Sequence, residues 1–234
     1  MQDLDLDSLK KGQVLLIDKP LEWTSFDVVN KLRYAILKKY NLRKFKVGHA
    51  GTLDPLASGL LLICVGKATK SIQQFQNLDK EYTGRFYLGA TTPSYDMETP
   101  VNQTFETGHI TEKLILETAA NFIGKQSQVP PMFSAIKKNG KKMYEHARKG
   151  ETIEIKPRDV TIKSFDILKI EMPEVHFRVT VSKGTYIRSL AYDFGKALNA
   201  GAYLSELRRT KIGSFDVNNA ITHQQWIDAL NNEG

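Results

Sequence analysis

One short segment combines the residue types that an active-site loop needs. It runs from Gly48 and His49 through Gly51 to Asp54 and Pro55, and an apolar stretch follows closely. The glycines give the backbone freedom, whereas Pro55 restricts the preceding residue to extended or turn conformations. A carboxylate held in this way just before a strand suits a nucleophile or a general base. The same spacing also fits a purely structural role, in which Asp54 forms an Asx turn ahead of Pro55.

A second segment is distinguished by its positive charge. The segment 137–150 contains one acidic residue, Glu145, and six basic residues. The basic residues are Lys137, Lys138, Lys141, Lys142, Arg148 and Lys149. Such a charge run often forms only a solvated face, but here Gly140 and Tyr144 interrupt it and Gln128-Val-Pro-Pro precedes it. We therefore predict a thumb-like insertion over about 126–150 that grips phosphates. A second basic cluster consists of Arg208, Arg209 and Lys211.

Composition restricts the class of protein. The chain has 33 Lys and Arg against 26 Asp and Glu, and its net charge of +7 favours an anionic partner, either nucleic acid or an acidic membrane. The single Cys64 excludes a disulfide framework and a multi-cysteine zinc site, and its apolar neighbours predict a buried, reduced thiol. The longest apolar run, Leu60–Val65, is far shorter than the ~20 residues that span a bilayer. Since the acidic N-terminus is unlike a signal peptide, a cytoplasmic protein without a membrane partner is expected.

Helices and strands that must position these residues occur in a mixed order. Strands are predicted at 14–17, 60–65, 82–88, 160–170 and 175–182, with the last two forming a hairpin. Helices are predicted at 24–40, 111–122, 186–198 and after Thr222. Thr24 with Asp27 and Thr222 with Gln225 resemble capping boxes. Phe26 belongs to the apolar stripe of the helix at 24–40. Residues 46–59 are predicted as a loop and 92–108 as an exposed connection. The lack of regular alternation favours an α+β fold with a mostly antiparallel sheet.

Five motifs resemble those of the TruB family of tRNA pseudouridine synthases. The segment from Val47 to Leu61, which contains Asp54, is similar to the central motif of that family. The other motifs occur in the family's order, and they are Gly12–Pro20 with Thr24-Ser25, Lys80–Tyr82 with Leu88-Gly89, the basic segment from Gln128 to Arg148, and Gly184–Leu190 with Leu207–Thr210. Together they cover most of residues 12–213, and such an ordered set is far more specific than one motif.

The resemblance implies a fold and a reaction. The fold would be that of the pseudouridine synthases, with an active-site cleft across a mixed sheet flanked by helices, in a single catalytic domain over 1–234. The reaction would convert uridine to pseudouridine at position 55 in the T-loop of tRNA. The N1–C1′ bond breaks, the uracil turns while bound, and C5 joins C1′ without redox change, cofactor or metal. The partner would be the T-arm stem-loop of tRNA, with no protein partner and a monomeric enzyme.

The resemblance also assigns catalytic roles to three residues. Asp54 would be the catalytic carboxylate, and Arg188 would pair with it through a two-pronged guanidinium contact. Tyr82 would stack on the flipped uracil and could take or give a proton. Judged without the family, Arg188 also fits a solvated helix arginine and Tyr82 a buried strand aromatic. Whether the carboxylate attacks the sugar, attacks the base or removes a sugar proton stays open.

The remaining site residues would bind the RNA. Lys19 and Pro20 would line the pocket and Leu207 would pack nearby. His49 would fill the gap that the extruded base leaves in the T-loop, since extrusion costs a few kcal/mol. A metal-binding role for His49 is disfavoured because no second histidine stands at ligand spacing. The backbone of the RNA would be held by Lys137, Lys138, Lys141, Lys142 and Arg148.

The sequence departs from the family pattern at a few positions. Glu22 stands where the family usually has glycine, and a positive φ there would carry strain of order 1 kcal/mol. In the family's Thr-x-Thr-x-Asp-x-x-Gly stretch, Thr92 and Asp96 fit, whereas Ser94 and Thr99 replace threonine and glycine. The chain ends about twenty residues after Gly213, so we expect no C-terminal RNA-binding domain of the PUA type.

Two functions of other classes compete with the isomerase. A non-catalytic RNA-folding chaperone would share the basic patches but would not need Asp54, Tyr82 and Arg188 together. A hydrolase that uses His49 and Asp54 would need a partner base or a set of metal ligands for which the sequence offers no convincing candidates. The sequence therefore favours the isomerase.

Overall fold

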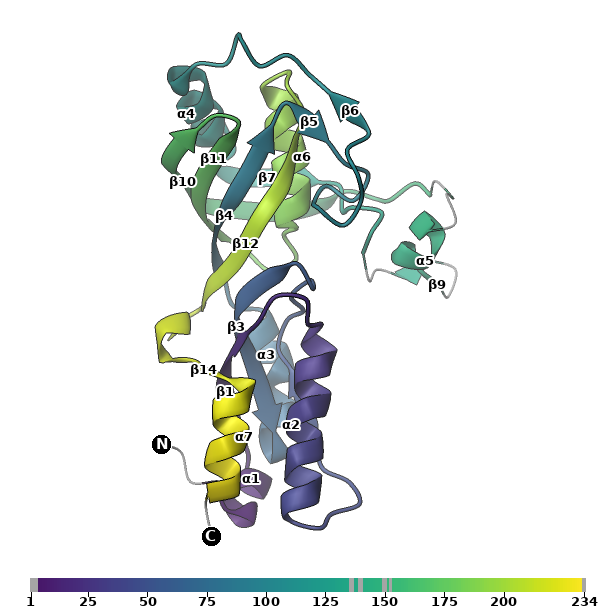
Figure 1. Cartoon of the computed structure of the whole chain (residues 1–234), viewed down its shortest axis with the longest axis vertical. Coiled ribbons are helices and arrows are strands. Elements are labelled where there is room, and N and C mark those ends of the chain that lie inside the picture. The colour runs from purple at the N-terminus through teal and green to yellow at the C-terminus, as the bar shows by residue number, and fades with distance from the viewer. Residues whose placement is uncertain (1–3, 135–136, 139–140, 149–150, 152, 233–234) are drawn as a thin grey trace. The chain divides into compact units, whose positions relative to one another are not determined.

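The computed structural model describes residues 4–134, 137–138, 141–148, 151 and 153–232, which form two compact units. The first unit contains residues up to 82 and from 207 onward, and the second contains residues 83–206. The chain passes from one unit to the other within strands β4 (Lys80–Leu88) and β12 (Ala202–Ile212), which are labelled in Figure 1. Each unit is described by itself.

Strands of the first unit follow the order β14-β1-β3-β12, and β2 pairs with β3 and β13 with β12. Their bounds are β1 (Gln13–Lys19), β2 (Val47–His49), β3 (Ala57–Val65), β13 (Phe215–Asp216) and β14 (Ile221–Thr222). The helices are α1 (Leu6–Lys11), α2 (Ser25–Lys39), α3 (Ile72–Gln76) and α7 (His223–Asn232), with 3₁₀ turns at Gly66–Ser71 and Val217–Asn219.

The central strand β3 is buried on both faces. Leu61 and Ile63 point into a core that α2 and α7 cover, together with Leu32 from α2 and Trp226 from α7. Leu60 and Leu62 point into a second core on the opposite face, which includes Phe75 from α3. Burial on both faces explains why this strand is a continuous apolar run instead of an alternating one.

Both predicted capping boxes of the first unit are confirmed. The Thr24 hydroxyl accepts from Asp27 N–H at 3.0 Å, and the Asp27 carboxylate accepts from Thr24 N–H at 2.9 Å. Thr222 and Gln225 make the same reciprocal pair at the start of α7, at 3.1 and 2.8 Å. The placement of Phe26 on the buried face of α2 is wrong, because its side chain is 58% exposed.

The predicted loop over 46–59 is shorter than expected. Val47 pairs with Val65 and His49 with Ile63, so β2 adds an antiparallel strand to β3. Residues 50–56 remain as the connection, and Ala57 already belongs to β3. The three-residue strand lacks an alternating pattern that would reveal it, because its pairing depends on β3 and not on its own composition.

Strands of the second unit follow the order β12-β4-β11-β10-β7. The further strands are β5 (Ala90–Thr91), β6 (Gln103–Thr104), β7 (Gly124–Gln128), β8 (Lys137–Lys138), β9 (Lys141–Lys142), β10 (Arg158–Glu171) and β11 (Glu174–Val181). The helices are α4 (Glu112–Asn121), α5 (Met143–Arg148) and α6 (Ile187–Ala197). β10 and β11 pair antiparallel from Ile162↔Val181 to Glu171↔Glu174, which confirms the predicted hairpin.

The core of the second unit is built around aromatic rings. Phe86 of β4 lies against Phe177 of β11 at 4.2 Å between ring centroids and against Phe194 of α6 at 5.4 Å. Phe165 of β10 joins the same cluster. Offset and tilted ring pairs of this kind stabilise a core beyond their area alone. They fix α6 on the sheet, and α6 carries Arg188 in its first turn.

The prediction that residues 92–108 form an exposed connection is wrong for its first half. Thr92, Ser94 and Asp96 are buried. The hydroxyl groups of Thr92 and Ser94 donate to the carbonyl oxygen of Asp96 at 2.6 and 3.2 Å, which closes a tight turn. A run of polar residues in a sequence predicts an exposed segment, but here the polar residues satisfy one another's hydrogen bonds inside the unit.

Helices and antiparallel strands therefore build both units, as the prediction of an α+β fold with a mostly antiparallel sheet required. Parallel pairing occurs between β1 and β14 and between β3 and β12. Within the described residues, the helices are too short or too polar to cross a membrane.

Candidate active site

The connection between β2 and β3 holds Asp54 by hydrogen bonds on both sides. The buried Ser25 hydroxyl, at the N-terminus of α2, accepts from Leu53 N–H at 2.8 Å and donates to Leu53 O at 3.1 Å. On the other side, Glu22 N–H donates to Pro55 O at 2.8 Å. The residues before and after Asp54 are thus fixed to the segment between β1 and α2, and the carboxylate is presented on a rigid backbone.

Glu22 adopts the left-handed conformation that the glycine at this position of the family would favour. Its φ is +66°, which costs a non-glycine residue roughly 1–2 kcal/mol. The chain accepts this strain, and in this conformation the Glu22 N–H donates to Pro55 O. The strained residue therefore supports the backbone beside Asp54.

A buried cation, Arg209, supports the same loop from below. Its side chain is 1% exposed, and its guanidinium donates to Leu60 O at 2.7 Å, Gly51 O at 3.1 Å and Thr52 O at 3.4 Å. The sequence placed Arg209 in a basic cluster for RNA, and for this residue that interpretation is wrong. Its neighbour Arg208 instead makes a two-pronged ion pair with Asp18, at 3.0 and 2.7 Å.

Lys19 lies at the end of β1 and is fully buried. Its ammonium donates to Pro20 O at 2.8 Å and Trp23 O at 2.7 Å. Burial lowers the pKa of Lys19 to about 8, while the nearby Asp54 carboxylate opposes this shift. Lys19 therefore brings an electrostatic partner to Asp54 and at the same time orders the turn that starts with Pro20.

Other predicted site residues of the first unit lie on its strands. Leu207 of β12 is opposite Ala57 of β3 in the parallel pair of these strands, and Ala57 is three residues after Asp54 in the sequence. Tyr82 of β4 is 9% exposed, as the strand-aromatic interpretation also required. His49 ends β2, and burial lowers its pKa, which favours the neutral imidazole. A neutral ring suits stacking in an RNA loop.

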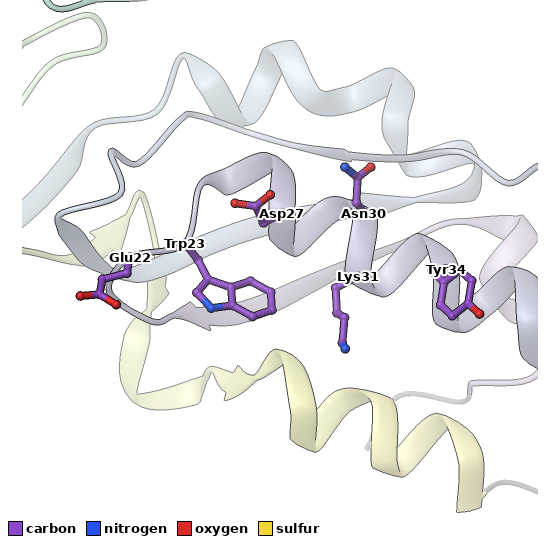
Figure 2. A pocket seen from close by; sticks show the side chains of 6 residues that line it. All are labelled: Glu22, Trp23, Asp27, Asn30, Lys31 and Tyr34. Carbon is purple, nitrogen blue, oxygen red and sulfur yellow. The ribbon is translucent and has the colours of Figure 1, made fainter.

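The described part of the first unit also contains a hollow of about 500 Å³ on the outer side of α2. Figure 2 shows its lining residues, which are Glu22, Trp23, Asp27, Asn30, Lys31 and Tyr34. The Trp23 ring stacks on His223 of α7 at 4.3 Å between centroids. Two carboxylates line this hollow, so it disfavours a phosphate group.

In the second unit, Arg188 is buried with an acidic partner that the sequence did not single out. Arg188 Nε lies 3.5 Å from Asp96 Oδ2, and Arg188 Nη1 donates to Ser94 O at 3.4 Å. The side chains of Arg188 and Asp96 are 6% and 8% exposed, so the solvated-helix interpretation of Arg188 is wrong. Ninety-two residues separate the two partners, and only the match of Asp96 to the family stretch marks it in the sequence.

The two residues that depart from the family stretch contact each other. Ser94 and Thr99 hydroxyl oxygens are 2.8 Å apart, and each hydroxyl accepts from the other residue's N–H, at 3.1 and 3.2 Å. The pair closes the turn that carries Asp96. The expected contact between Arg188 and Asp54 joins the two units, so it stays a prediction.

The basic segment forms a small hairpin followed by a helix. Lys137 is opposite Lys142 and Lys138 is opposite Lys141 in the pair of β8 and β9, and α5 follows with Arg148 as its last residue. Gly140 and Lys149 lie outside the described residues. The Tyr144 hydroxyl of α5 donates to Glu98 Oε1 at 2.6 Å, which ties the segment to the turn that carries Asp96.

Comparison with known proteins gives consistent matches over most of the chain. Residues 38–187 match the model of the TruB family pseudouridylate synthase N-terminal domain, and residues 188–233 match a tRNA pseudouridylate synthase B C-terminal domain. A tRNA pseudouridine synthase B of Flavobacterium johnsoniae is 65% identical over 94% of this chain and 96% of its own length. The protein of the same name from Phocaeicola vulgatus is 50% identical over 94% and 95%.

A solved structure of a Cbf5–Nop10–Gar1 complex has the same fold. It superposes with a TM-score of 0.70 at 34% identity, over 94% of this chain and 54% of that chain. The present chain thus spans about half the length of that solved protein. Its own fold is accordingly that of the pseudouridine synthases. With a family model that covers residues 38–187 and relatives matched over nearly their full length, the chain belongs to the TruB family of pseudouridylate synthases.

Proposed function

We propose that this protein isomerises uridine to pseudouridine in tRNA, at position 55 of the T-loop. The relatives that match it over nearly their whole length are named tRNA pseudouridine synthase B. The observation that supports the chemistry best is the double clamp on the Asp54 loop, in which Ser25 holds Leu53 and Glu22 holds Pro55. Catalysis gains from such rigidity because a positioned group need not be ordered during the reaction.

The reaction rearranges bonds within one nucleotide. The N1–C1′ bond breaks, the uracil rotates in the pocket, and C5 bonds to C1′. C5 then loses a proton and N1 gains one, so the composition and the oxidation state are unchanged. The protein must supply a positioned carboxylate, a surface for the rotating base and a path for these protons.

Asp54 is the proposed catalytic carboxylate and Arg188 its proposed pairing partner. The charge of Lys19, which interacts with Asp54, would attract the carboxylate without needing to touch the RNA. Tyr82 would stack on the uracil and transfer protons, and Leu207 would line the base pocket. In the second unit, Asp96 would hold the guanidinium of Arg188 in a fixed orientation through their ion pair.

RNA binding would depend on His49 and the basic segment. A neutral His49 ring would fill the gap left by the extruded base, which offsets part of the few kcal/mol that extrusion costs. Phosphates of the T-arm would be held by Lys137, Lys138, Lys141, Lys142 and Arg148, whose backbone forms the hairpin and the following helix. Pro20 would contribute to the pocket wall through its turn with Lys19.

The test is the variant Asp54→Asn, which keeps the shape of the side chain and removes its charge. Pseudouridine is mapped in unmodified tRNA, and tRNA binding is measured in parallel. We expect turnover to fall at least ~10³-fold while binding is retained, since a positioned acid–base group contributes on this scale. Asp166→Asn, on the exposed part of β10, is the control. Normal pseudouridine formation by Asp54→Asn would refute the assignment, and binding without turnover in the unaltered protein would favour the chaperone.

A further inference from the structure

The second unit contains a polar, half-enclosed cavity that the proposed reaction does not use. Its volume is about 510 Å³, within the range of roughly 300–1,000 Å³ that is usual for ligand sites. Residues from three segments line it, namely the stretch from β5 to Tyr95, the start of β6, and the C-terminal half of α6 with the following turn. All of them belong to residues 83–206, so the cavity lies within one unit.

Two tyrosine rings form one wall of this cavity. Tyr95 and Tyr192 stack with centroids 4.2 Å apart and planes inclined by 19°. Tyr95 has a φ of +64°, a conformation that costs a bulky residue energy and that tends to persist at functional positions. Its N–H donates to Thr92 O at 3.1 Å and its carbonyl accepts from Leu204 N–H at 2.9 Å, and these bonds hold the strained residue in place.

The rest of the lining offers hydrogen bonds and one positive charge. Asn102 is oriented by the Thr91 hydroxyl, which donates to its Oδ1 at 3.0 Å. Lys196 lies in the last turn of α6 and Asn199 follows the helix, and both residues are exposed. The described residues that line the cavity include no carboxylate, in contrast to the hollow on α2, although the Asp193 carboxylate of α6 interacts with Tyr95 and Lys196.

The cavity is attached to both members of the buried ion pair. Tyr95 directly precedes Asp96, and Arg188, Tyr192 and Lys196 follow one another at intervals of four along α6. Residues four apart lie on the same side of a helix. The two segments that hold the Arg188–Asp96 pair therefore also form the cavity walls, so a ligand in the cavity would contact the supports of that pair.

We propose that this cavity binds an unstacked nucleotide of the substrate RNA, with its base on the Tyr95–Tyr192 stack and its phosphate near Lys196. Single-stranded nucleotides are recognised by aromatic stacking together with hydrogen bonds from amide groups and a nearby positive charge. The lining combines these three chemistries, whereas a peptide-binding groove would offer mainly apolar anchor pockets. This inference rests on the proposed function for its RNA partner, and it adds a subsite apart from Asp54.

The first experiment measures tRNA binding in the inactive Asp54→Asn background. Tyr192→Leu removes the aromatic face but keeps an apolar side chain, and we expect the Kd to rise about 5- to 50-fold. Lys196→Gln changes only an exposed side chain, and we expect it to flatten the slope of log Kd against log salt by about 0.7–0.9. Tyr203→Leu is the matched control because it disrupts another stacked tyrosine pair, Tyr87–Tyr203, at the same inclination of 19°.

A second measurement separates the possible sources of the nucleotide. Uridine and adenosine 5′-monophosphate are titrated while tyrosine fluorescence is recorded, and tRNA is titrated in the same way. Loss of tRNA affinity in Tyr192→Leu and Lys196→Gln but not in Tyr203→Leu supports the subsite. The subsite is refuted if free nucleotides bind at the tyrosines while the cavity variants bind tRNA as well as Tyr203→Leu does. It is also refuted if the cavity variants bind both the free nucleotides and tRNA as the unaltered protein does.

Failure of this subsite and failure of the proposed function give different results. If the unaltered protein forms no pseudouridine in tRNA, the proposed function is wrong whatever the cavity binds. If it forms pseudouridine and the cavity variants bind tRNA like the Tyr203→Leu control, only the subsite is wrong. A protein partner captured through the cavity with unchanged tRNA affinity would also refute the RNA subsite.

Discussion

Ser25 offers the sharpest test of how the fold positions Asp54. The variant Ser25→Ala removes a hydroxyl that is 2% exposed and that makes both an acceptor and a donor bond with Leu53. The N–H and the carbonyl of Leu53 would then lose their partner in a buried environment. An unsatisfied buried polar group costs about 1–3 kcal/mol, so we expect a loss of about 2 kcal/mol in the free energy of unfolding.

The same substitution should reduce activity by more than its effect on stability explains. For a protein of this size, about 2 kcal/mol corresponds to a fall in Tm of ~4–8 °C. Asp54 follows Leu53 directly, and a displacement of about 1 Å in a reacting group can reduce turnover ~100-fold. We expect kcat to fall ~10- to 100-fold at a temperature well below the Tm of the variant, while the Kd for tRNA changes little.

The assay compares Ser25→Ala with a variant that loses a stabilising hydrogen bond outside the Asp54 loop. Thr111→Ala removes the N-cap of α4, whose hydroxyl accepts from Leu114 N–H at 3.2 Å, and such caps contribute about 1 kcal/mol. Both variants are followed by thermal unfolding and by single-turnover pseudouridine formation at saturating enzyme. If Ser25→Ala loses stability but keeps the rate of the control, the clamp does not position Asp54 and the reasoning fails.

Three further predictions address other parts of the site. Arg188→Lys retains the charge, but lysine cannot contact both Asp96 and the Ser94 carbonyl with one planar group. Turnover should therefore fall at least ~10-fold. A variant that keeps more than half of the normal activity would contradict the proposed pairing of Arg188 with Asp54. Replacing Lys137, Lys138, Lys141 and Lys142 with glutamine should weaken tRNA binding and flatten its salt dependence, by about 0.7–0.9 for each lost phosphate contact; an unchanged slope would identify a solvated face. The pKa of Lys19 is about 8 in the folded protein and 10.5 in the unfolded chain, so the folded protein loses this proton at lower pH. The free energy of unfolding should therefore rise as the pH increases from 8 to 10.5, by up to about 3 kcal/mol. Lys19→Met should lack this rise in urea titrations, and parallel pH profiles of the two proteins would show that burial does not perturb Lys19.

Local elements were predictable because their signals lie within a few residues. The Thr24–Asp27 and Thr222–Gln225 boxes, the helix predicted at 186–198 and the β10–β11 hairpin all depend on short spacings, and the structure confirms them. The ordered motifs likewise identify the family and the segment that contains Asp54 from the sequence alone. In these cases the physical cause, a cap or a turn or a face of a helix, is itself local.

The tertiary structure decided the features whose partners are distant in sequence. Arg209 looks like one more surface cation, yet it lies 149 residues from Leu60 and binds that carbonyl in the interior. Asp96 and Ser94 look like loop residues, yet they are buried around Arg188. A buried charge is tolerated only where the fold supplies polar partners for it, and the sequence around a residue does not reveal which distant groups will meet it. The sequence by itself therefore determined the local elements and the family, and the folded chain determined which distant groups hold the proposed site residues.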